Sequence, residues 1–157
     1  MKKLCYSITA IAIALTCVFF TESCSEDTNK LSRLPEFSGI SLSSETLNAG
    51  ETITATAVQY KKGKYLDRTT YTWTCEGAEL SGATTGVFYD SNSKDPDCQI
   101  KLPSEPGSYT IKFEATYNFS AKANNSTKEV DCQGGTITYT SSPLTGYVKI
   151  TRTIRVK

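Results

Sequence analysis

Apolar and polar residues alternate with a period of two along much of this chain. The longest run, SYTIKFEATYNF at positions 108–119, places an apolar set on one face: Tyr109, Ile111, Phe113, Ala115, Tyr117 and Phe119. Thr, Lys, Glu and Asn occupy most of the other face. An alternation sustained over this length predicts a β-strand with one face buried and the other in water.

Shorter runs of the same kind predict further strands, at residues 37–43, 51–59, 71–77, 82–89, 98–102 and 147–157. In YTWTCEG we expect Tyr71, Trp73 and Cys75 to point inward. Gly, Pro, Asn and Asp separate these runs, and no stretch keeps a helical apolar repeat for three turns. Short strands divided by turn residues predict a single all-β domain, a sandwich or a barrel.

The last run, YVKITRTIRVK, places Arg152 on the apolar face of its strand. A buried charge is costly, so we expect a bulge at Arg152 or an edge position from which it reaches water. An insertion precedes this strand at residues 118–146. Within it, VDCQGGTITYT predicts a hairpin in which Gly134 and Gly135 supply positive φ angles, and AKANNST predicts a solvated loop.

The start of the chain has a different composition. Lys2 and Lys3 precede an uncharged run from Ile8 to Phe20. Thirteen residues are too few to cross a bilayer but are typical of the apolar region of a secretory signal. We therefore predict an export signal over residues 1–23 and exclude it from the fold.

Ser23-Cys24 is similar to the lipobox of bacterial lipoproteins, in which the cysteine is acylated. Thr21 and Glu22 depart from the usual lipobox, and Cys17 is a competing site whose use would leave Val18-Phe19-Phe20 exposed. The SEDT stretch after Cys24 suits a solvated tether and resembles the surface-export signal of some Gram-negative lipoproteins. The resemblance implies a lipidated tether at residues 24–35 and a domain at 36–157, anchored in the outer membrane and facing outward. The alternative is a soluble secreted protein.

The composition argues against several functions. Without residues 1–23 the chain carries 15 basic and 15 acidic residues, so no basic excess favours nucleic acid as a partner. The sequence has no histidine, which removes the commonest general base and the commonest metal ligand. We predict no enzymatic activity and no cofactor.

Three features occur in order: Trp73 in YTWT, then EPGSY at 105–109, then a final TRTIRVK. Together they resemble the immunoglobulin-like β-sandwich of the PKD (polycystic kidney disease) type, found on many bacterial surface proteins. The resemblance covers residues 35–119 and 144–157, and it implies that Trp73 is the buried tryptophan of the third strand and Tyr109 the corner tyrosine. Ala57 and Ile111 stand where such domains often have a disulfide, and CEGA replaces the family's Gly-Asp-Gly turn. The chain also resembles the anchor-proximal domain of outer-membrane lipoproteins in glycan-uptake systems.

Three cysteines follow Cys24, namely Cys75, Cys98 and Cys132. Exported proteins meet oxidising conditions, so two of them could pair. The sandwich topology places the start of the Cys98 strand and the insertion that bears Cys132 toward the same end, which favours a Cys98–Cys132 disulfide with Cys75 buried beside Trp73. Three unpaired thiols are the alternative. Without histidine or a C-x-x-C pair, zinc is not expected.

The run DSNSKDPD at residues 90–97 has oxygen ligands of the kind that calcium prefers: Asp90, Asn92, Asp95 and Asp97. However, Asp95 stands where an EF-hand loop needs glycine, and Lys101 stands where it needs glutamate. We therefore interpret the run as an acidic turn and predict no metal site.

Five aromatic residues lie in predicted loops or edge segments: Tyr60, Tyr65, Phe88, Tyr89 and Tyr139. Such rings suit stacking on sugars or contacts with proteins; alternatively they cover the ends of the core. The favoured hypothesis is a non-catalytic binding or spacer module held at the cell surface by lipid, with other surface proteins as partners. The alternative is a glycan-binding accessory of a polysaccharide-uptake system. A hydrolase with paired carboxylates and a pilus subunit are weaker hypotheses.

Overall fold

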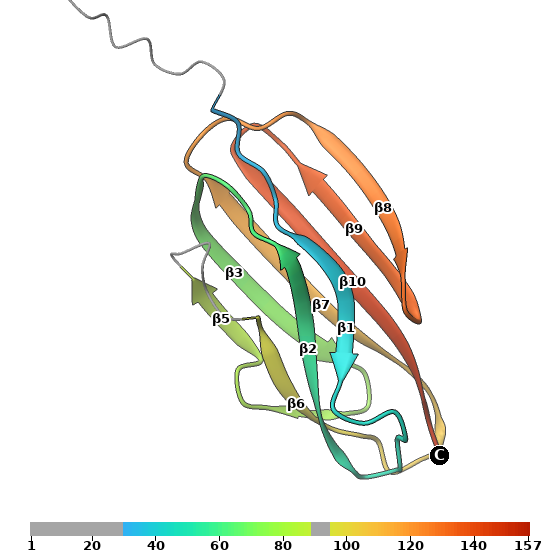
Figure 1. The fold of residues 1–157 in the computed structure, drawn as a ribbon. Coiled ribbons are helices and arrows are strands. Elements are labelled where there is room, and N and C mark those ends of the chain that lie inside the picture. The colour runs from blue at the N-terminus through green and yellow to red at the C-terminus, as the bar shows by residue number, and fades with distance from the viewer. Residues whose placement is uncertain (1–29, 89–94) are drawn as a thin grey trace, which may run out of the picture.

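The computed structural model describes residues 30–88 and 95–157. Its strands are β1 (Glu36–Leu42), β2 (Thr52–Lys61), β3 (Leu66–Cys75), β4 (Glu79–Ser81), β5 (Thr85–Phe88), β6 (Asp97–Lys101), β7 (Gly107–Phe119), β8 (Ser126–Cys132), β9 (Gly135–Ser141) and β10 (Thr145–Val156) (Figure 1). The described residues contain no helix long and apolar enough to pass through a bilayer.

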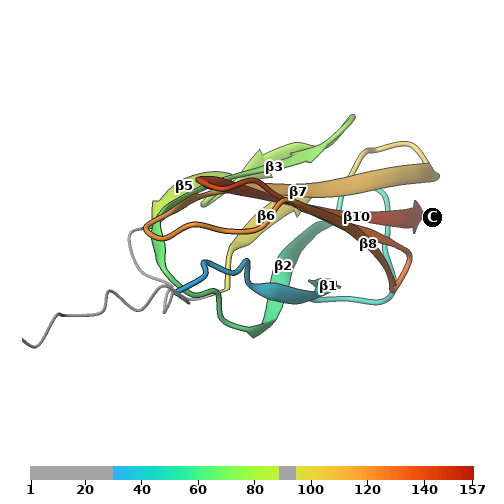
Figure 2. The same cartoon turned by 90° about the horizontal axis from the view of Figure 1, so that it is seen from above.

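The strands form two antiparallel sheets that pack face to face. One sheet has the order β1-β2-β6-β4, and the other has the order β5-β3-β7-β10-β9-β8. Figure 2 shows β1 and β2 in one layer and β3, β7 and β10 in the other. The predicted all-β architecture with two layers is confirmed.

The core lies between the sheets and follows the predicted alternation. On β7, Ile111, Phe113, Ala115, Tyr117 and Phe119 are buried, while Tyr109 at the start of the strand is only half-buried. Phe113 is at the centre, with its ring centroid 4.9 Å from that of Trp73 and 5.8 Å from that of Phe37 in the opposite sheet. Burying a side chain such as Phe113 stabilises the fold by about 1.5–3 kcal/mol.

The expected bulge or water-accessible edge at Arg152 was wrong. The pairing of β10 with β7 runs without a register shift from Thr145 to Val156, and Arg152 is only 6 % exposed. Its Nη1 donates a hydrogen bond of 2.6 Å to the carbonyl oxygen of Ile40, and its Nη2 lies 3.8 Å from Glu45 Oε2. The charge is tolerated inside because β1 of the opposite sheet supplies an acceptor and the β1–β2 connection supplies the carboxylate of Glu45.

The predicted hairpin is present as β8 and β9, and it extends the six-stranded sheet beyond β10. Cys132 pairs with Gly135, so Gln133 and Gly134 form the turn, and Gly134 has a φ of +72°. Gly135 does not have the positive φ that we expected. It is needed for close packing instead, because a β-carbon there would lie 1.9 Å from the carbonyl oxygen of Thr151. Of the predicted solvated loop AKANNST, residues 121–125 form a loop, but Ala123 is buried and Ser126 and Thr127 begin β8.

Candidate binding groove

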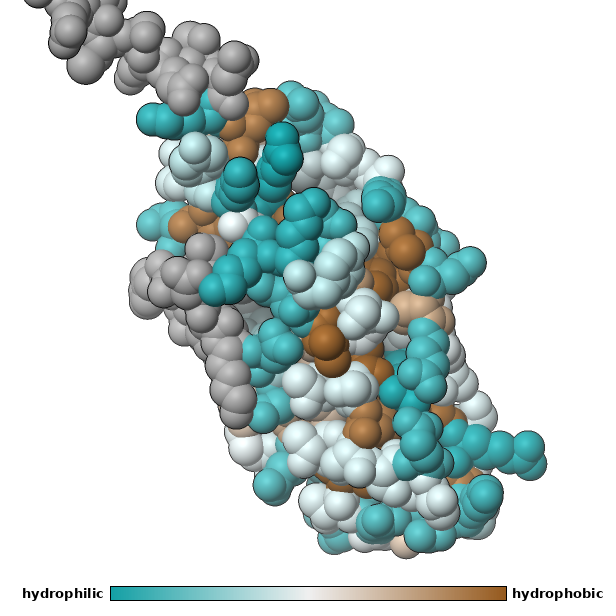
Figure 3. Space-filling model, viewed as in Figure 1, coloured by the Kyte–Doolittle hydropathy of each residue, from teal (hydrophilic) through white to brown (hydrophobic). Residues whose placement is uncertain are grey.

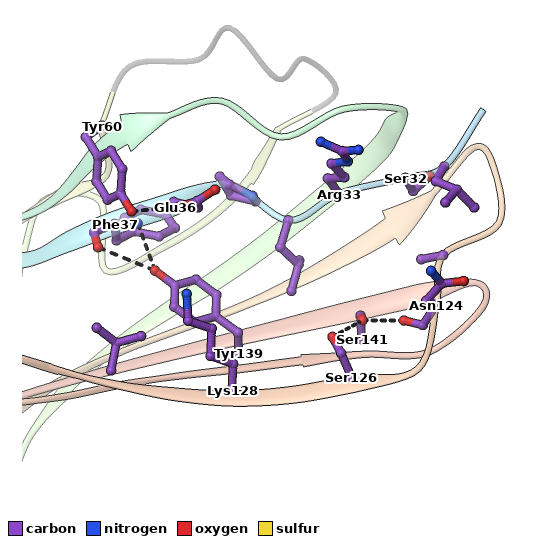
Figure 4. A pocket seen from close by; sticks show the side chains of 15 residues that line it. Ser32, Arg33, Glu36, Phe37, Tyr60, Asn124, Ser126, Lys128, Tyr139 and Ser141 are labelled. Carbon is purple, nitrogen blue, oxygen red and sulfur yellow. Dashed lines mark hydrogen bonds between the residues drawn. The ribbon is translucent and has the colours of Figure 1, made fainter. Parts of the chain in front are cut away.

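A groove of about 450 Å³ opens between the start of the folded chain and the β8–β9 hairpin (Figure 4). One wall is the segment from Leu31 to Phe37, and the other is the face of the hairpin that bears Lys128, Val130 and Tyr139. Tyr60 and the loop residues Ala123 and Asn124 complete the lining. A cavity of this size falls within the range of small-ligand sites.

The first wall belongs to a segment that we expected to be flexible tether, yet it is packed. Ser32 is buried, and its hydroxyl oxygen lies within donating distance of two carbonyl oxygens, that of Ala121 at 2.7 Å and that of Tyr65 at 3.0 Å. Arg33 forms an isolated antiparallel bridge with Lys64. The folded domain therefore begins near Leu31 rather than after Pro35.

Tyr139 forms the floor of the groove and joins the two sheets. Its hydroxyl accepts a 2.9 Å hydrogen bond from the backbone N–H of Phe37 and lies 3.4 Å from the carbonyl oxygen of the same residue. Phe37 is in β1, the last strand of its sheet, so these groups face away from the ladder partner. Burial raises the pKa of Tyr139, and its hydroxyl is therefore neutral at physiological pH.

Tyr60 and Glu36 form one rim. Tyr60 is 64 % exposed, and its hydroxyl donates to Glu36 Oε2 at 2.7 Å. Lys61 Nζ lies 2.5 Å from Glu36 Oε1. The hydrogen bond from Lys61, followed by that from Tyr60, lowers the pKa of Glu36, whereas the bond to Glu36 raises the pKa of Tyr60. Glu36 is thus ionised at neutral pH and fixes the direction of an exposed aromatic ring.

Hydroxyl groups and an amide form the opposite rim. Ser141 Oγ donates to the carbonyl oxygen of Asn124 at 2.6 Å, and Ser126 Oγ lies 2.8 Å from Ser141 Oγ. Lys128 lies on the same face of the hairpin and adds a positive charge. Glu36 is the one acidic residue among the lining residues, so the carboxylate pair of a glycoside hydrolase is not formed in this groove. An apolar floor with a few polar groups at the rim is the usual composition of a small-ligand site.

The structure brings together two of the five predicted aromatic residues, Tyr60 and Tyr139. Tyr65 lies outside the groove in a turn with a φ of +53°, where it is 42 % exposed. Phe88 ends β5, at the opposite edge of the six-stranded sheet from β8. Tyr89 and the predicted lipidation site Cys24 lie outside the described residues.

Several polar groups of the groove were not predicted: Glu36, Asn124, Ser126, Lys128 and Ser141. Glu36 is far in sequence from the others, and only the packing of β1 beside the hairpin brings them together. One local signal was available, because the alternation in STKEVDC places Ser126, Lys128 and Val130 on one face.

The Cys98–Cys132 disulfide that we favoured is absent, and Cys75, Cys98 and Cys132 are thiols. Cys98 is buried in β6, whereas Cys132 packs against Gly39 of β1, where a β-carbon added to the glycine would lie 3.4 Å from Cys132 Cβ. Strand β2 separates β1 from β6, a displacement of about 10 Å. The Cα atoms of a disulfide lie within about 7 Å of each other, so the two cysteines are too far apart.

Much of the acidic run at 90–97 lies outside the described residues, including Asp90 and Asn92. Among residues 30–88 and 95–157, no group of three or more Cys, Asp or Glu side chains is arranged to hold a metal ion.

Comparisons of the chain with protein-family models, with curated proteins and with solved structures found no match.

Proposed function

We propose that this protein is a non-catalytic binding module with an immunoglobulin-like fold of the PKD type, anchored in the outer membrane through acylated Cys24 and facing outward. The observation that supports a binding role is the groove. It combines an apolar floor at Phe37 and Tyr139 with an exposed aromatic ring and ionic groups at the rim.

Three observations support the immunoglobulin-like fold. The order β1-β2-β6-β4 against β3-β7-β10 agrees with the A-B-E-D and C-F-G sheets of immunoglobulin domains. Trp73 in the third strand is buried against Phe113. The hydroxyl of Tyr109 donates to the carbonyl oxygen of Glu105 at 2.9 Å, which is the contact of a tyrosine corner. On this proposal β8 and β9 are an addition between the last two strands of the family pattern.

The anchor is tested by mass spectrometry of the mature protein from membranes. We expect a chain that begins at Cys24 with its thiol and amino group acylated, and we expect a Cys24→Ala variant to lose the lipid. Protease treatment of intact cells should degrade the domain if it faces outward. An unmodified Cys24, or a mature chain that begins at another residue such as Ser25, would contradict the anchor.

Binding through the groove is tested by photo-crosslinking on intact cells. A photoreactive amino acid in place of Tyr60 should capture a specific neighbour, because the ring at this position is exposed at the rim. The same amino acid at Thr153, an exposed position on β10 remote from the groove lining, is the matched control. Equal capture at both positions, or capture at neither, would count against the groove as the binding site.

A glycan-binding accessory role is the second candidate. The exposed Tyr60 ring beside the Glu36 carboxylate favours it, since sugars bind to aromatic faces bordered by polar groups. In a panel of polysaccharides, Tyr60→Ala should weaken binding by about tenfold or more, a loss equivalent to about 1.4 kcal/mol. Tyr65→Asn removes an exposed ring outside the groove and serves as the control. A uniform absence of binding across the panel would eliminate this candidate.

A further inference from the structure

The exposed hydrophobic side chains gather at one end of the domain. Among the described residues, the large hydrophobic side chains that are exposed are Leu31 (37 %), Tyr60 (64 %), Tyr65 (42 %) and Leu144 (68 %). Backbone hydrogen bonds join their segments: Ser32 to Lys122, Ser120 to Tyr65 and Phe119 to Leu144. We call this end, made of residues 30–36, 60–68, 119–124 and 142–146, the tethered end, because the described chain enters there (Figure 1).

The tethered end is also basic. It carries two acidic residues, Glu36 and Asp67, and Glu36 is paired with Lys61. Its basic residues number seven: Lys30, Arg33, Lys61, Lys62, Lys64, Arg68 and Lys122. Figure 3 shows hydrophilic side chains around a hydrophobic patch where the described chain begins.

The opposite end of the domain has the reverse charge. We call residues 43–51, 75–79, 101–106 and 155–157 the distal end; hydrogen bonds of Ala49 to Lys157 and of Gly50 to Pro103 hold it together. Its acidic residues are Glu45, Glu51, Glu76, Glu79 and Glu105, and its basic residues are Lys101, Arg155 and Lys157. The excess of basic over acidic residues is therefore five at the tethered end and minus two at the distal end, a polarity that the balanced total charge conceals.

We propose that the tethered end docks on a bilayer surface rich in anionic headgroups; because the groove lining shares Leu31, Arg33 and Tyr60 with this end, the occupants of the groove are then partners that lie at the membrane. Lysine and arginine are attracted to such a surface, and tyrosine and leucine side chains suit the boundary between headgroups and acyl chains. The inference builds on the proposed acylation of Cys24. Lys30 is six residues beyond Cys24, a separation of at most about 21 Å, so a lipid at Cys24 would keep this end at the membrane. The attraction of the tethered end to the bilayer is weak by itself, and the lipid at Cys24 then adds a second attachment that strengthens it.

The test uses a chain that begins at Ser25. Every core residue lies between Phe37 and Val156, so this chain keeps the whole core and lacks the acylation site. We expect it to cosediment with vesicles of phosphatidylcholine and phosphatidylglycerol about tenfold more tightly than with phosphatidylcholine alone, and the difference should fall at high salt.

Matched charge reversals locate the surface. The pair Lys64→Glu and Lys122→Glu at the tethered end should reduce affinity for anionic vesicles by about tenfold or more. The pair Arg155→Glu and Lys157→Glu at the distal end makes the same change in net charge and should alter affinity by less than about twofold. In a third variant, Leu144→Ser with Tyr65→Asn, binding should weaken even where salt screens the charges; Asn accepts the positive φ of residue 65.

Any of three results would overturn the proposal. They are equal binding to neutral and anionic vesicles, equal loss of affinity for anionic vesicles in the two charge-reversed pairs, and binding only to soluble polysaccharide. Fluorescence of Trp73 confirms that each variant is folded. Because this chain has no lipid, its result is independent of the acylation of Cys24, which mass spectrometry reads separately.

Discussion

The guanidinium of Arg152 donates a hydrogen bond of 2.6 Å to the carbonyl oxygen of Ile40, and this bond joins β10 of one sheet to the last strand of the other. Tyr139 makes a similar connection farther along β1, at Phe37. Polar side chains of the six-stranded sheet thus satisfy backbone groups on the unpaired edge of β1. Tyr139 and Phe37 both line the groove, so their contact holds β1 beside the hairpin at that site.

Replacing Arg152 should destabilise the fold through loss of this bond. We expect Arg152→Ala to lower the free energy of unfolding by about 2–4 kcal/mol, because it leaves the Ile40 carbonyl without its donor and removes buried packing. Urea unfolding followed by Trp73 fluorescence measures the change. Glu45→Gln is the control: Glu45 is 79 % exposed and should contribute less than about 0.5 kcal/mol. An equal loss in both variants would mean that the ion pair, not the bond to Ile40, stabilises this edge.

Two tyrosine hydroxyls at the groove should differ in their contribution to stability. Tyr139→Phe should cost about 1–2 kcal/mol, because the backbone N–H of Phe37 loses its acceptor in a half-buried site. Tyr60→Phe should change the free energy of unfolding by less than about 0.5 kcal/mol, since that hydroxyl is exposed. Chemical denaturation measures the free energy of unfolding of both variants. Similar losses in the two would contradict the bridging role of Tyr139.

The turn of the β8–β9 hairpin gives a test of close packing. Gly135→Ala would place a β-carbon 1.9 Å from the carbonyl oxygen of Thr151 and should cost more than about 2 kcal/mol. At Gly50 the φ is +72° but no atom lies within 4 Å of such a β-carbon, so Gly50→Ala should cost only about 1 kcal/mol of backbone strain. Thermal unfolding of the two variants compares their stability. A Gly135→Ala variant as stable as Gly50→Ala would show that the hairpin is not seated on β10 as described.

The three thiols should differ in reactivity. Burial raises the pKa of Cys98 to about 12, and it also raises the pKa of Cys75 and of Cys132. At pH near 8 the reactive thiolate is therefore scarce at all three cysteines, and the order in which they are alkylated depends on how easily the reagent reaches each sulfur. We expect slow alkylation of the half-buried Cys132 in the native protein and alkylation of Cys75 and Cys98 only after unfolding. Peptide mapping without reductant that finds a Cys98–Cys132 bridge would contradict the arrangement of β1, β2 and β6.

Glu36 should make a small contribution to the pH dependence of stability. Its pKa in the folded protein lies below the usual 4.5, mainly because of the hydrogen bond from Lys61. The unfolded chain binds this proton more readily, so the stabilisation is present above about pH 4.5 and is lost as the pH falls through the folded pKa. The pair is largely exposed, and we expect less than about 1 kcal/mol. Glu36→Gln should reduce the fall in the free energy of unfolding at acidic pH. An unchanged fall would count against a stabilising interaction between Glu36 and Lys61.

The sequence by itself determined the local features of this protein. The inward positions of Trp73, Ile111 and Phe113 follow from alternation, because the backbone of a strand directs successive side chains to opposite faces. The hairpin around Gly134 was predicted for a similar reason, since a tight turn depends on residues that are adjacent in the chain. The existence of most strands also needed only local patterns, whereas their bounds and the choice of a sandwich over a barrel did not.

Only the tertiary structure decided what lies beside the unpaired edge of β1. The burial of Arg152, the bridge from Tyr139 to Phe37 and the packing of Ser32 depend on residues about 90 to 110 positions apart. The separation of Cys98 from Cys132 depends on which strand lies between them. No period in the sequence encodes these relationships, because they arise from the order in which strands pair and from the edge at which the two sheets meet.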